Sequence, residues 1–376
     1  PKEWHQHMKA LLEELGWKAL ARDECLFRKR SGRKSCWLML DVDDLLLAGD
    51  HHTLEPSLKA IAGRVSLKWE VIRADEDESR TYLGRVITQK DGMFTVGMGS
   101  QYVDRCLESM GMADCKPLDT ISFPMRLEVD EEPLDEDSKD LFRHVVGCLL
   151  WVQQERPDLS VAVNLLACEM SSPTVGGMKA LKRVMRYLRK YPECVVAVSP
   201  VDLPRVRSQN ELVLDCYRES DWPGDLLCRF SRSGWCIYLN SYPLVCGTRR
   251  QRAVALSSAE AEFYSSSVAT AEALHLRELI AELMDLEPPS VHLNLYTDST
   301  SCRSLMMRAG PGQSKHVATR LLWLQSYVRE GLVFPHRVPT ESNPADLMTK
   351  ITSGQIAERL RPLTGWVPVS GRDRRT

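Results

Sequence analysis

Hydrophobic and polar residues recur along most of the chain with the spacings of strands and helices, and these spacings predict a mixed α/β protein. In the last third, alternating apolar positions predict strands at 211–218, 233–240, 243–250, 291–298 and 332–339. Helical spacing predicts helices at 258–285 and 315–330, and a final helix that opens within 343–350. Three strands joined by short polar turns, followed by alternating helices and strands, predict a five-stranded mixed sheet with helices on its faces.

The first hundred residues show shorter elements of both kinds. The spacing predicts a helix over 2–15 that ends at Gly16, strands over 26–30 and 36–50, a helix over 52–65, and a hairpin over 81–98. Asp91-Gly92 is the predicted turn of that hairpin. The second strand segment contains an acidic turn at Asp43-Asp44.

The middle of the chain changes in composition twice. Residues 116–140 are rich in Pro, Asp and Glu and predict an extended linker. Three helical patterns follow, within 141–170 and 173–191. A turn-rich segment at 199–210 then marks the predicted boundary of the last domain.

Composition narrows the class of protein. The apolar fraction is 43% and the charged fraction 27%, as in ordinary globular domains. The formal net charge of −2 gives no overall basic field, so binding to nucleic acid would depend on local patches. The 12 cysteines form no CxxC pairs, which is typical of reduced, intracellular thiols. We find no signal peptide and no apolar stretch long enough to span a bilayer. Because the chain begins with Pro1, we expect a piece of a longer protein.

Four acidic residues in the last third stand at the edges of predicted elements. They are Glu219, Glu262, Asp298 and Asp346. Carboxylates brought together from four elements repel one another unless a cation neutralises them. Mg²⁺, or Mn²⁺ in its place, prefers such oxygen ligands and keeps waters for chemistry on phosphates. The pattern therefore predicts a divalent-metal nuclease site.

The helix over 258–285 offers two candidate acids at its start, Glu260 and Glu262, and they point to different faces. Ser257 or Ser258 is a suitable N-cap. An alternative interpretation is that both acids only favour the helix dipole. The order of all four acidic positions favours the metal site, and the choice of Glu262 over Glu260 as its ligand comes from the family resemblance described next.

These motifs resemble the ribonuclease H domain of copia-type LTR retrotransposons over residues 211–350. The family string resembles S-D-x-D-W-A-G-D, S-T-S-G, A-L-S-S-x-E-A-E-Y, D-N/S, K-H and N-x-A-D-x-x-T-K. This chain has ESDWPGD, SRSG, ALSSAEAEF, TDS, KH and NPADLMTK in the same order. The resemblance implies hydrolysis of the RNA strand of an RNA–DNA hybrid by two metal ions ~4 Å apart. It assigns the four acids above as metal ligands.

Glu219 departs from the family string, which has Asp at this position. The extra methylene moves the carboxylate by about 1 Å, and Mg²⁺ tolerates little departure from octahedral geometry. We therefore expect weak activity. The alternatives are a catalytically inactive remnant that at most binds duplex, and a structural domain with no nucleic-acid role, which requires the motif order to be accidental.

The N-terminal part resembles the reverse transcriptase of the same elements. LMLDVDDLLLAGD resembles their Y-V-D-D-L-L-L-A-G turn, with Asp43 and Asp44 as the implied metal ligands and Asp41 in place of Tyr. The alternative interpretation is an exposed acidic hairpin that binds no metal. In the family a further Asp and the fingers precede the point where this chain starts, so we expect polymerase activity to be lost.

The resemblance divides the chain into four predicted regions: a truncated palm (1–115), a linker with a helical thumb or connection (116–205), a ribonuclease H-like domain (206–352) and a tail (353–376). Predicted contacts to the hybrid are Arg249, Arg250, Arg252, Lys315 and His316. For Lys315 and His316 a plain helix face is an equal alternative. The other implied partner is the rest of the Pol polyprotein.

Overall fold

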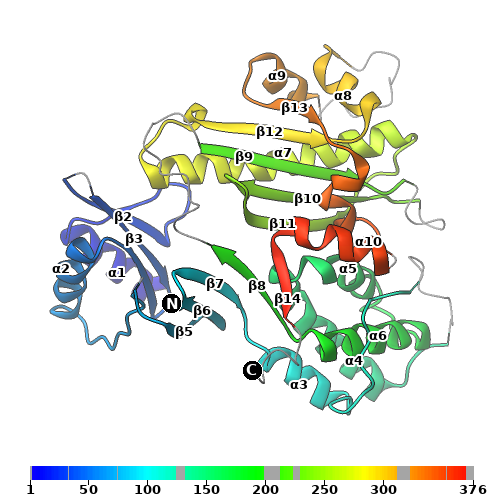
Figure 1. Ribbon diagram of the computed structural model, residues 1–376, viewed down its shortest axis with the longest axis horizontal. Coiled ribbons are helices and arrows are strands. Elements are labelled where there is room, and N and C mark those ends of the chain that lie inside the picture. The colour runs from blue at the N-terminus through cyan, green and yellow to red at the C-terminus, as the bar shows by residue number, and fades with distance from the viewer. Residues whose placement is uncertain are drawn as a thin grey trace.

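The computed structural model describes residues 2–32, 34–73, 75–123, 132–198, 212–222, 229–310, 322–352 and 354–369. Within these residues the protein is a mixed α/β structure with three separate sheets and ten α-helices (Figure 1). No helix in the described part combines the length and apolar character needed to cross a membrane.

The first sheet is antiparallel and lies near the N-terminus. Its strands, in order, are β1 (Lys18–Ala19), β2 (Leu26–Ser31), β3 (Lys34–Asp41) and β4 (Asp44–Gly49). Helices α1 (Lys2–Glu14) and α2 (His51–Ala62) bury Met8, Leu12 and Ile61 against Phe27 and Leu38 of the sheet. The alternating apolar residues of β3 therefore face these helices.

A second antiparallel sheet has the order β14-β8-β7-β6-β5. Its strands are β5 (Glu78–Tyr82), β6 (Arg85–Lys90), β7 (Met93–Met98), β8 (Glu193–Val198) and β14 (Trp366–Val369). The predicted hairpin is β6–β7, whereas β8 and β14 were not predicted. This sheet joins segments from three of the four regions proposed from sequence, and that division stays a prediction.

Four helices form the middle of the chain: α3 (Gln101–Ser109), α4 (Glu136–Val152), α5 (Ser160–Cys168) and α6 (Val175–Lys190). Helices α4, α5 and α6 are the three helices that the apolar spacing predicts. Phe142, Leu149, Leu166 and Leu181 meet in their core without solvent exposure. The predicted boundary segment 199–210 lies outside the described residues.

The third sheet carries the predicted metal site. Its strands are β9 (Leu212–Ser220), β10 (Arg232–Leu239), β11 (Tyr242–Arg250), β12 (Val291–Thr297) and β13 (Phe334–Arg337), in the order β11-β10-β9-β12-β13. β9 pairs antiparallel with β10 and parallel with β12. The predicted five-stranded mixed sheet is confirmed. Helix α7 (Ser258–Met284) packs Phe263 and Ala269 against Leu214 and Leu293.

Within the described residues, the remaining elements are three short helices that follow α7 in the chain and six 3₁₀ turns, two of which lie between α4 and α5. They are α8 (Thr300–Met307), α9 (Trp323–Arg329) and α10 (Gly354–Leu360), with 3₁₀ turns η1 (Gln153–Glu155), η2 (Pro157–Leu159), η3 (Pro288–Ser290), η5 (Thr340–Ser342), η6 (Pro344–Met348) and η7 (Pro362–Thr364). The predicted helix within 343–350 is wrong in kind: it is the 3₁₀ helix η6. Pro344 suits the first position of such a short turn, and the backbone N–H of Thr349 closes the segment on the carbonyl of Asp346.

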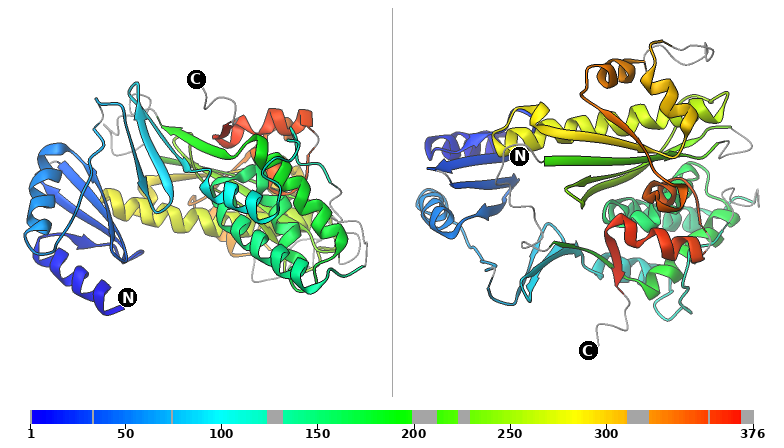
Figure 2. Two further views of the ribbon diagram at one scale, coloured as in Figure 1. Left: turned by 90° about the horizontal axis from the view of Figure 1, so that it is seen from below. Right: turned by 45° about the horizontal axis from the view of Figure 1, so that its top comes forward.

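The first sheet contacts the C-terminal end of α7, which is the end that lies far from Glu262. Trp37 Nε1 donates to the carbonyl of Leu283 at 3.0 Å, and Arg28 contacts Asp285 at 2.6 Å. Figures 1 and 2 show the N-terminal sheet beside this end of α7. At 1.5 Å per residue, Glu262 and Asp285 are about 34 Å apart along the helix. The two acidic regions predicted from sequence are therefore on different parts of the molecule.

Candidate metal centre

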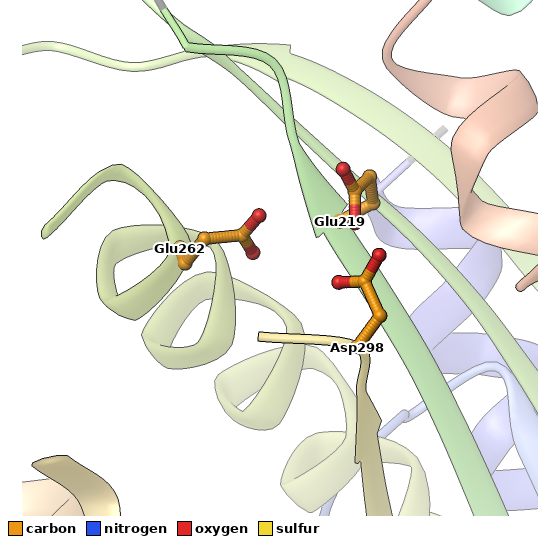
Figure 3. Close-up of side chains that lie close together, drawn as sticks. All are labelled: Glu219, Glu262 and Asp298. Atoms are coloured by element: carbon orange, nitrogen blue, oxygen red, sulfur yellow. The ribbon is translucent and has the colours of Figure 1, made fainter. Parts of the chain in front are cut away.

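Three acidic side chains from three separate elements meet at one end of the β9–β12 sheet. Glu219 ends β9, Glu262 lies in the first turns of α7, and Asp298 directly follows β12. One carboxylate oxygen from each lies within 4.8 Å of the others (Figure 3). Because β9 and β12 run parallel, their carboxyl ends reach the same edge of the sheet. Within the described ranges, this is the one group of three or more metal-ligating side chains.

The start of α7 separates the roles of Glu260 and Glu262. Ser257 accepts a hydrogen bond from the Glu260 N–H at 3.2 Å, and Glu260 Oε2 accepts one from the Leu256 N–H at 2.7 Å. These two hydrogen bonds hold the Glu260 carboxylate at the start of the helix, as in a capping box but with the residue before the N-cap as the donor. Glu262 is on another face and joins the cluster. The geometry thus favours Glu262, the residue chosen from sequence.

Two further hydrogen bonds fix the elements that carry these acids. Ser265 on α7 donates to the backbone carbonyl of Glu219 at 2.6 Å, and both groups are buried. Thr340 donates to Asp298 Oδ2 at 2.8 Å. Burial and these hydrogen bonds limit the motion of the three carboxylates, as a preorganised site requires.

Asp346 approaches the cluster because β10 carries a glycine opposite Glu219. Gly234 pairs with Glu219, and a Cβ built on Gly234 would lie 2.5 Å from Met348 Cβ and 2.7 Å from Thr349 Cγ2. Only a residue without a side chain allows η6 to pack this closely on the sheet. Asn343 donates to the backbone carbonyl of Arg218 at 3.2 Å and secures the start of η6.

A lysine links Asp346 to the three-carboxylate group. Lys350 Nζ lies 2.9 Å from Asp346 Oδ1 and 3.2 Å from Glu219 Oε1. Its side chain is 43% exposed, whereas those of Glu219 and Asp346 are 6% and 10% exposed. Asp346 is therefore connected to the cluster through a cation that reaches solvent.

A second cation, Arg218, is buried beneath the cluster. Its side chain is 0% exposed, and its two terminal nitrogens donate to Glu262 Oε2 and Thr297 Oγ1. Arg218 occupies the face of β9 that otherwise carries Leu214 and Cys216. An arginine at the end of an apolar alternation was the sequence signal for this ion pair, and our sequence interpretation missed it.

Burial dominates the electrostatics of the carboxylates. Burial first, and then the charge of Glu262, raise the pKa of Glu219 to about 9, while Lys350 opposes the shift. Burial also raises the pKa of Glu262 to about 7 despite the opposing charge of Arg218. Arg218 and Lys350 thus do not fully offset the cost of burying the charges of Glu219 and Glu262. A hard divalent cation such as Mg²⁺ or Mn²⁺ would favour the ionised carboxylates, whose oxygens are its preferred ligands.

The predicted nucleic-acid contacts are placed only in part. Arg249 and Arg250 end β11 and are exposed, and Arg252 follows them. Ser233 of β10 pairs with Arg249 on one side and with Ser220 on the other. The arginines therefore lie at the same end of the sheet as Glu219, two strand spacings or ~10 Å away. Lys315 and His316 lie outside the described residues.

The turn Asp43-Asp44 has a different setting. Asp43 and Asp44 are exposed, at the tip of the β3–β4 hairpin, and Asp41 pairs directly with Asp44. Val42 in the turn has a positive φ of 50°, and its carbonyl accepts a 2.8 Å hydrogen bond from Trp4 Nε1. Within the described residues, no third acidic, histidine or cysteine ligand joins this pair at metal-binding distance.

Sequence reasoning missed four residues that build the site: Arg218, Gly234, Asn343 and Lys350. Gly234 and the last two stood inside the quoted motif strings, SRSG and NPADLMTK, without a role. Their roles depend on η6 packing against β10, a contact between segments more than a hundred residues apart. Arg218 stands where the family string has Ser.

Comparison with known proteins gives retroelement relatives over nearly the whole chain. No protein-family model matches. The chain is 28% identical to the retrovirus-related Pol polyproteins from transposons RE2 and RE1 of Arabidopsis thaliana, over 93% of this chain. It is 24% identical to the one from transposon TNT 1-94 of Nicotiana tabacum, over 97% of this chain. The chain spans 23% to 27% of the length of these relatives. Its relatives over nearly the whole chain are retrovirus-related Pol polyproteins of transposons, which supports the copia-type Pol resemblance.

Proposed function

We propose that this retroelement-derived protein hydrolyses the RNA strand of RNA–DNA hybrids at the Glu219 cluster, with a divalent cation. The observation that carries the proposal is the convergence of Glu219, Glu262 and Asp298 from β9, α7 and the end of β12. The comparisons support it, since the chain is similar to Pol polyproteins over nearly its whole length. Asp346 is the fourth proposed acid of the site.

The donor set fits a magnesium or manganese ion. Glu219, Glu262 and Asp298 each offer a hard oxygen, and a cation would offset the repulsion that raises the carboxylate pKa values. When bound, such a cation supplies a Lewis acid for phosphate chemistry and lowers the pKa of water. Asp298 is the half-buried member of the three, so substrate would approach from its side.

The residues around the cluster would bind the substrate and position the acidic side chains. Arg249, Arg250 and Arg252 present exposed positive charge at the same sheet end and would contact the phosphates of the hybrid. Lys350 would hold Asp346 beside Glu219 until a cation and substrate replace its contacts. Asn343 and Gly234 would keep η6 in position.

A second candidate function is an inactive remnant that binds duplex without cleaving it. The ion pair between Arg218 and Glu262 favours it, because one carboxylate already has a cationic partner. Cleavage itself distinguishes the two.

The test measures cleavage of a labelled RNA–DNA hybrid by the purified chain with Mg²⁺ or Mn²⁺. We expect weak cleavage, stronger with Mn²⁺, that Asp298→Asn abolishes. Asp215→Asn is the matched control, because Asp215 lies on β9 outside the cluster and accepts a hydrogen bond from Asn294 at 2.9 Å. No cleavage by the folded parent with either ion would establish the inactive remnant instead.

A further inference from the structure

Two positive side chains share the carboxylate cluster, but only one can leave it. Lys350 is 43% exposed and sits on a flexible stem, so an incoming cation can displace its ammonium into solvent. Arg218 is 0% exposed. A guanidinium stays charged at every working pH and has no route to water from this position.

The position of Arg218 is fixed from both sides. Its terminal nitrogens donate to Glu262 Oε2 and to Thr297 Oγ1, the residue just before Asp298. Thr297 in turn accepts the Ser299 N–H at 3.0 Å, so the threonine is itself held. The guanidinium therefore lies between the α7 side and the β12 side of the cluster, and it occupies Glu262 Oε2.

Charge decides how many further cations the cluster accepts. When ionised, Glu219, Glu262, Asp298 and Asp346 carry four negative charges, and two divalent cations would balance them. Arg218 balances one of these charges permanently, and Lys350 balances a second only until it moves into solvent. With Lys350 displaced, three negative charges remain. One divalent ion leaves one of them uncompensated, and a second divalent ion would leave excess positive charge. Buried positive charge in excess is strongly unfavourable because desolvation is not compensated.

We infer that Arg218 is a built-in cation that occupies one of the two cation positions of the cluster, so that the site takes up one divalent ion instead of two. This rests on the proposed function, because it assumes that the cluster binds divalent ions. It deepens that proposal: the chain would be a one-ion site, set by a residue on the inner face of β9. The serine of the family string at this place offers no positive charge.

The test counts bound ions directly and needs no catalysis. Mn²⁺ is titrated into the metal-free full chain, and free Mn²⁺ is measured by its electron paramagnetic resonance signal. We expect one Mn²⁺ bound by the parent and two by Arg218→Ser. Arg218→Lys keeps the charge and should bind one. Arg277→Met is the matched control. It removes a buried guanidinium on α7 that donates to the Leu332 carbonyl at 2.9 Å, far from the cluster, and this variant should bind one Mn²⁺.

The variant could lose its fold because the freed carboxylates repel one another. Circular dichroism checks this, and Arg218→Met, which keeps the buried volume, replaces a serine variant that does not fold. A parent that binds Mn²⁺ and an arginine-free variant that binds no more than the parent would overturn this inference and leave the proposed function standing. A folded parent that binds no Mn²⁺ would overturn both.

Discussion

Two acidic regions of this chain contain predicted metal ligands, and the two regions differ in their burial and in their neighbours. Asp41, Asp43 and Asp44 are exposed on a hairpin, where water screens their charges. Glu219 and Glu262 are 4% and 5% exposed, and three elements force them towards Asp298. A string of acids predicts a metal site only when the fold removes water and brings ligands from different elements together.

The surroundings of the two regions make the same point. The buried cluster has two cationic neighbours, Arg218 and Lys350, and a glycine that admits η6. The hairpin holds its turn by one hydrogen bond from Trp4. Electrostatic interactions are stronger in the buried cluster than on the exposed hairpin, because the effective dielectric constant is lower away from water.

The largest expected effect is loss of cleavage on removing a ligand from the buried cluster alone. Glu262→Gln should lower the rate of hybrid cleavage about 100-fold or more, since even partners behind a ligand contribute up to that amount. The double variant Asp43→Asn/Asp44→Asn should cleave like the parent. Single-turnover assays with Mn²⁺ measure both rates. Equal losses in the two proteins would erase the distinction between the regions.

The second effect is a fall in stability of the metal-free protein as pH rises. The pKa of Glu219 is raised from 4.5 to about 9 and that of Glu262 to about 7, so the folded state binds more protons than the unfolded state across this window. The free energy of unfolding therefore decreases as pH rises, by up to about 1.4 kcal/mol per pH unit for each proton.

Urea unfolding in EDTA between pH 6 and pH 9 measures this slope. Glu219→Gln should flatten it, because the amide does not titrate, and saturating Mn²⁺ should flatten it in the parent. The same slope in the parent and in Glu219→Gln would show that Glu219 does not carry the effect.

The third effect compares two glycines. Gly234→Ala places a Cβ 2.5 Å from Met348 Cβ and should destabilise the fold by about 1–3 kcal/mol while displacing η6. Gly92→Ala in the β6–β7 turn meets nothing within 4 Å and pays only for its positive φ of 76°, about 1 kcal/mol. Denaturant midpoints give both values. Reduced Mn²⁺ affinity is expected for Gly234→Ala alone, and its absence would separate η6 from the site.

The smallest effect concerns the length of one side chain. Glu219→Asp withdraws the carboxylate by about 1 Å, and placement errors of that size cost up to about 100-fold in rate. We expect a gain of about 10-fold in cleavage with Mg²⁺ and less with Mn²⁺. A parent as fast as Glu219→Asp would mean that the glutamate is well placed.

Sequence predicted much of this fold because its elements are strongly periodic. The five strands around Glu219 and the long helix α7 were located within a few residues. β8 and β14 were missed because a short segment such as Glu193–Val198 becomes a strand only through its pairing with Phe94–Met98. The 3₁₀ form of η6 was missed for a similar reason, since its packing against Gly234 decides it.

The candidate site was predictable in its acids and not in its cations. Motif order pointed to Glu219, Glu262, Asp298 and Asp346. The Arg218–Glu262 ion pair joins residues of β9 and α7 that the local sequence does not bring together. Its existence depends on register and helix placement, which spacing alone does not specify.

Iron-directed backbone cleavage tests the central claim most directly. Fe²⁺ replaces the divalent ion in the purified full chain, ascorbate and peroxide generate radicals at the bound ion, and mass spectrometry maps the cuts. The account predicts cuts around residues 219, 262 and 298, suppressed by excess Mg²⁺ and absent in Asp298→Asn. Cuts confined to the Asp43-Asp44 turn, or none near Glu219 in the folded protein, would contradict it.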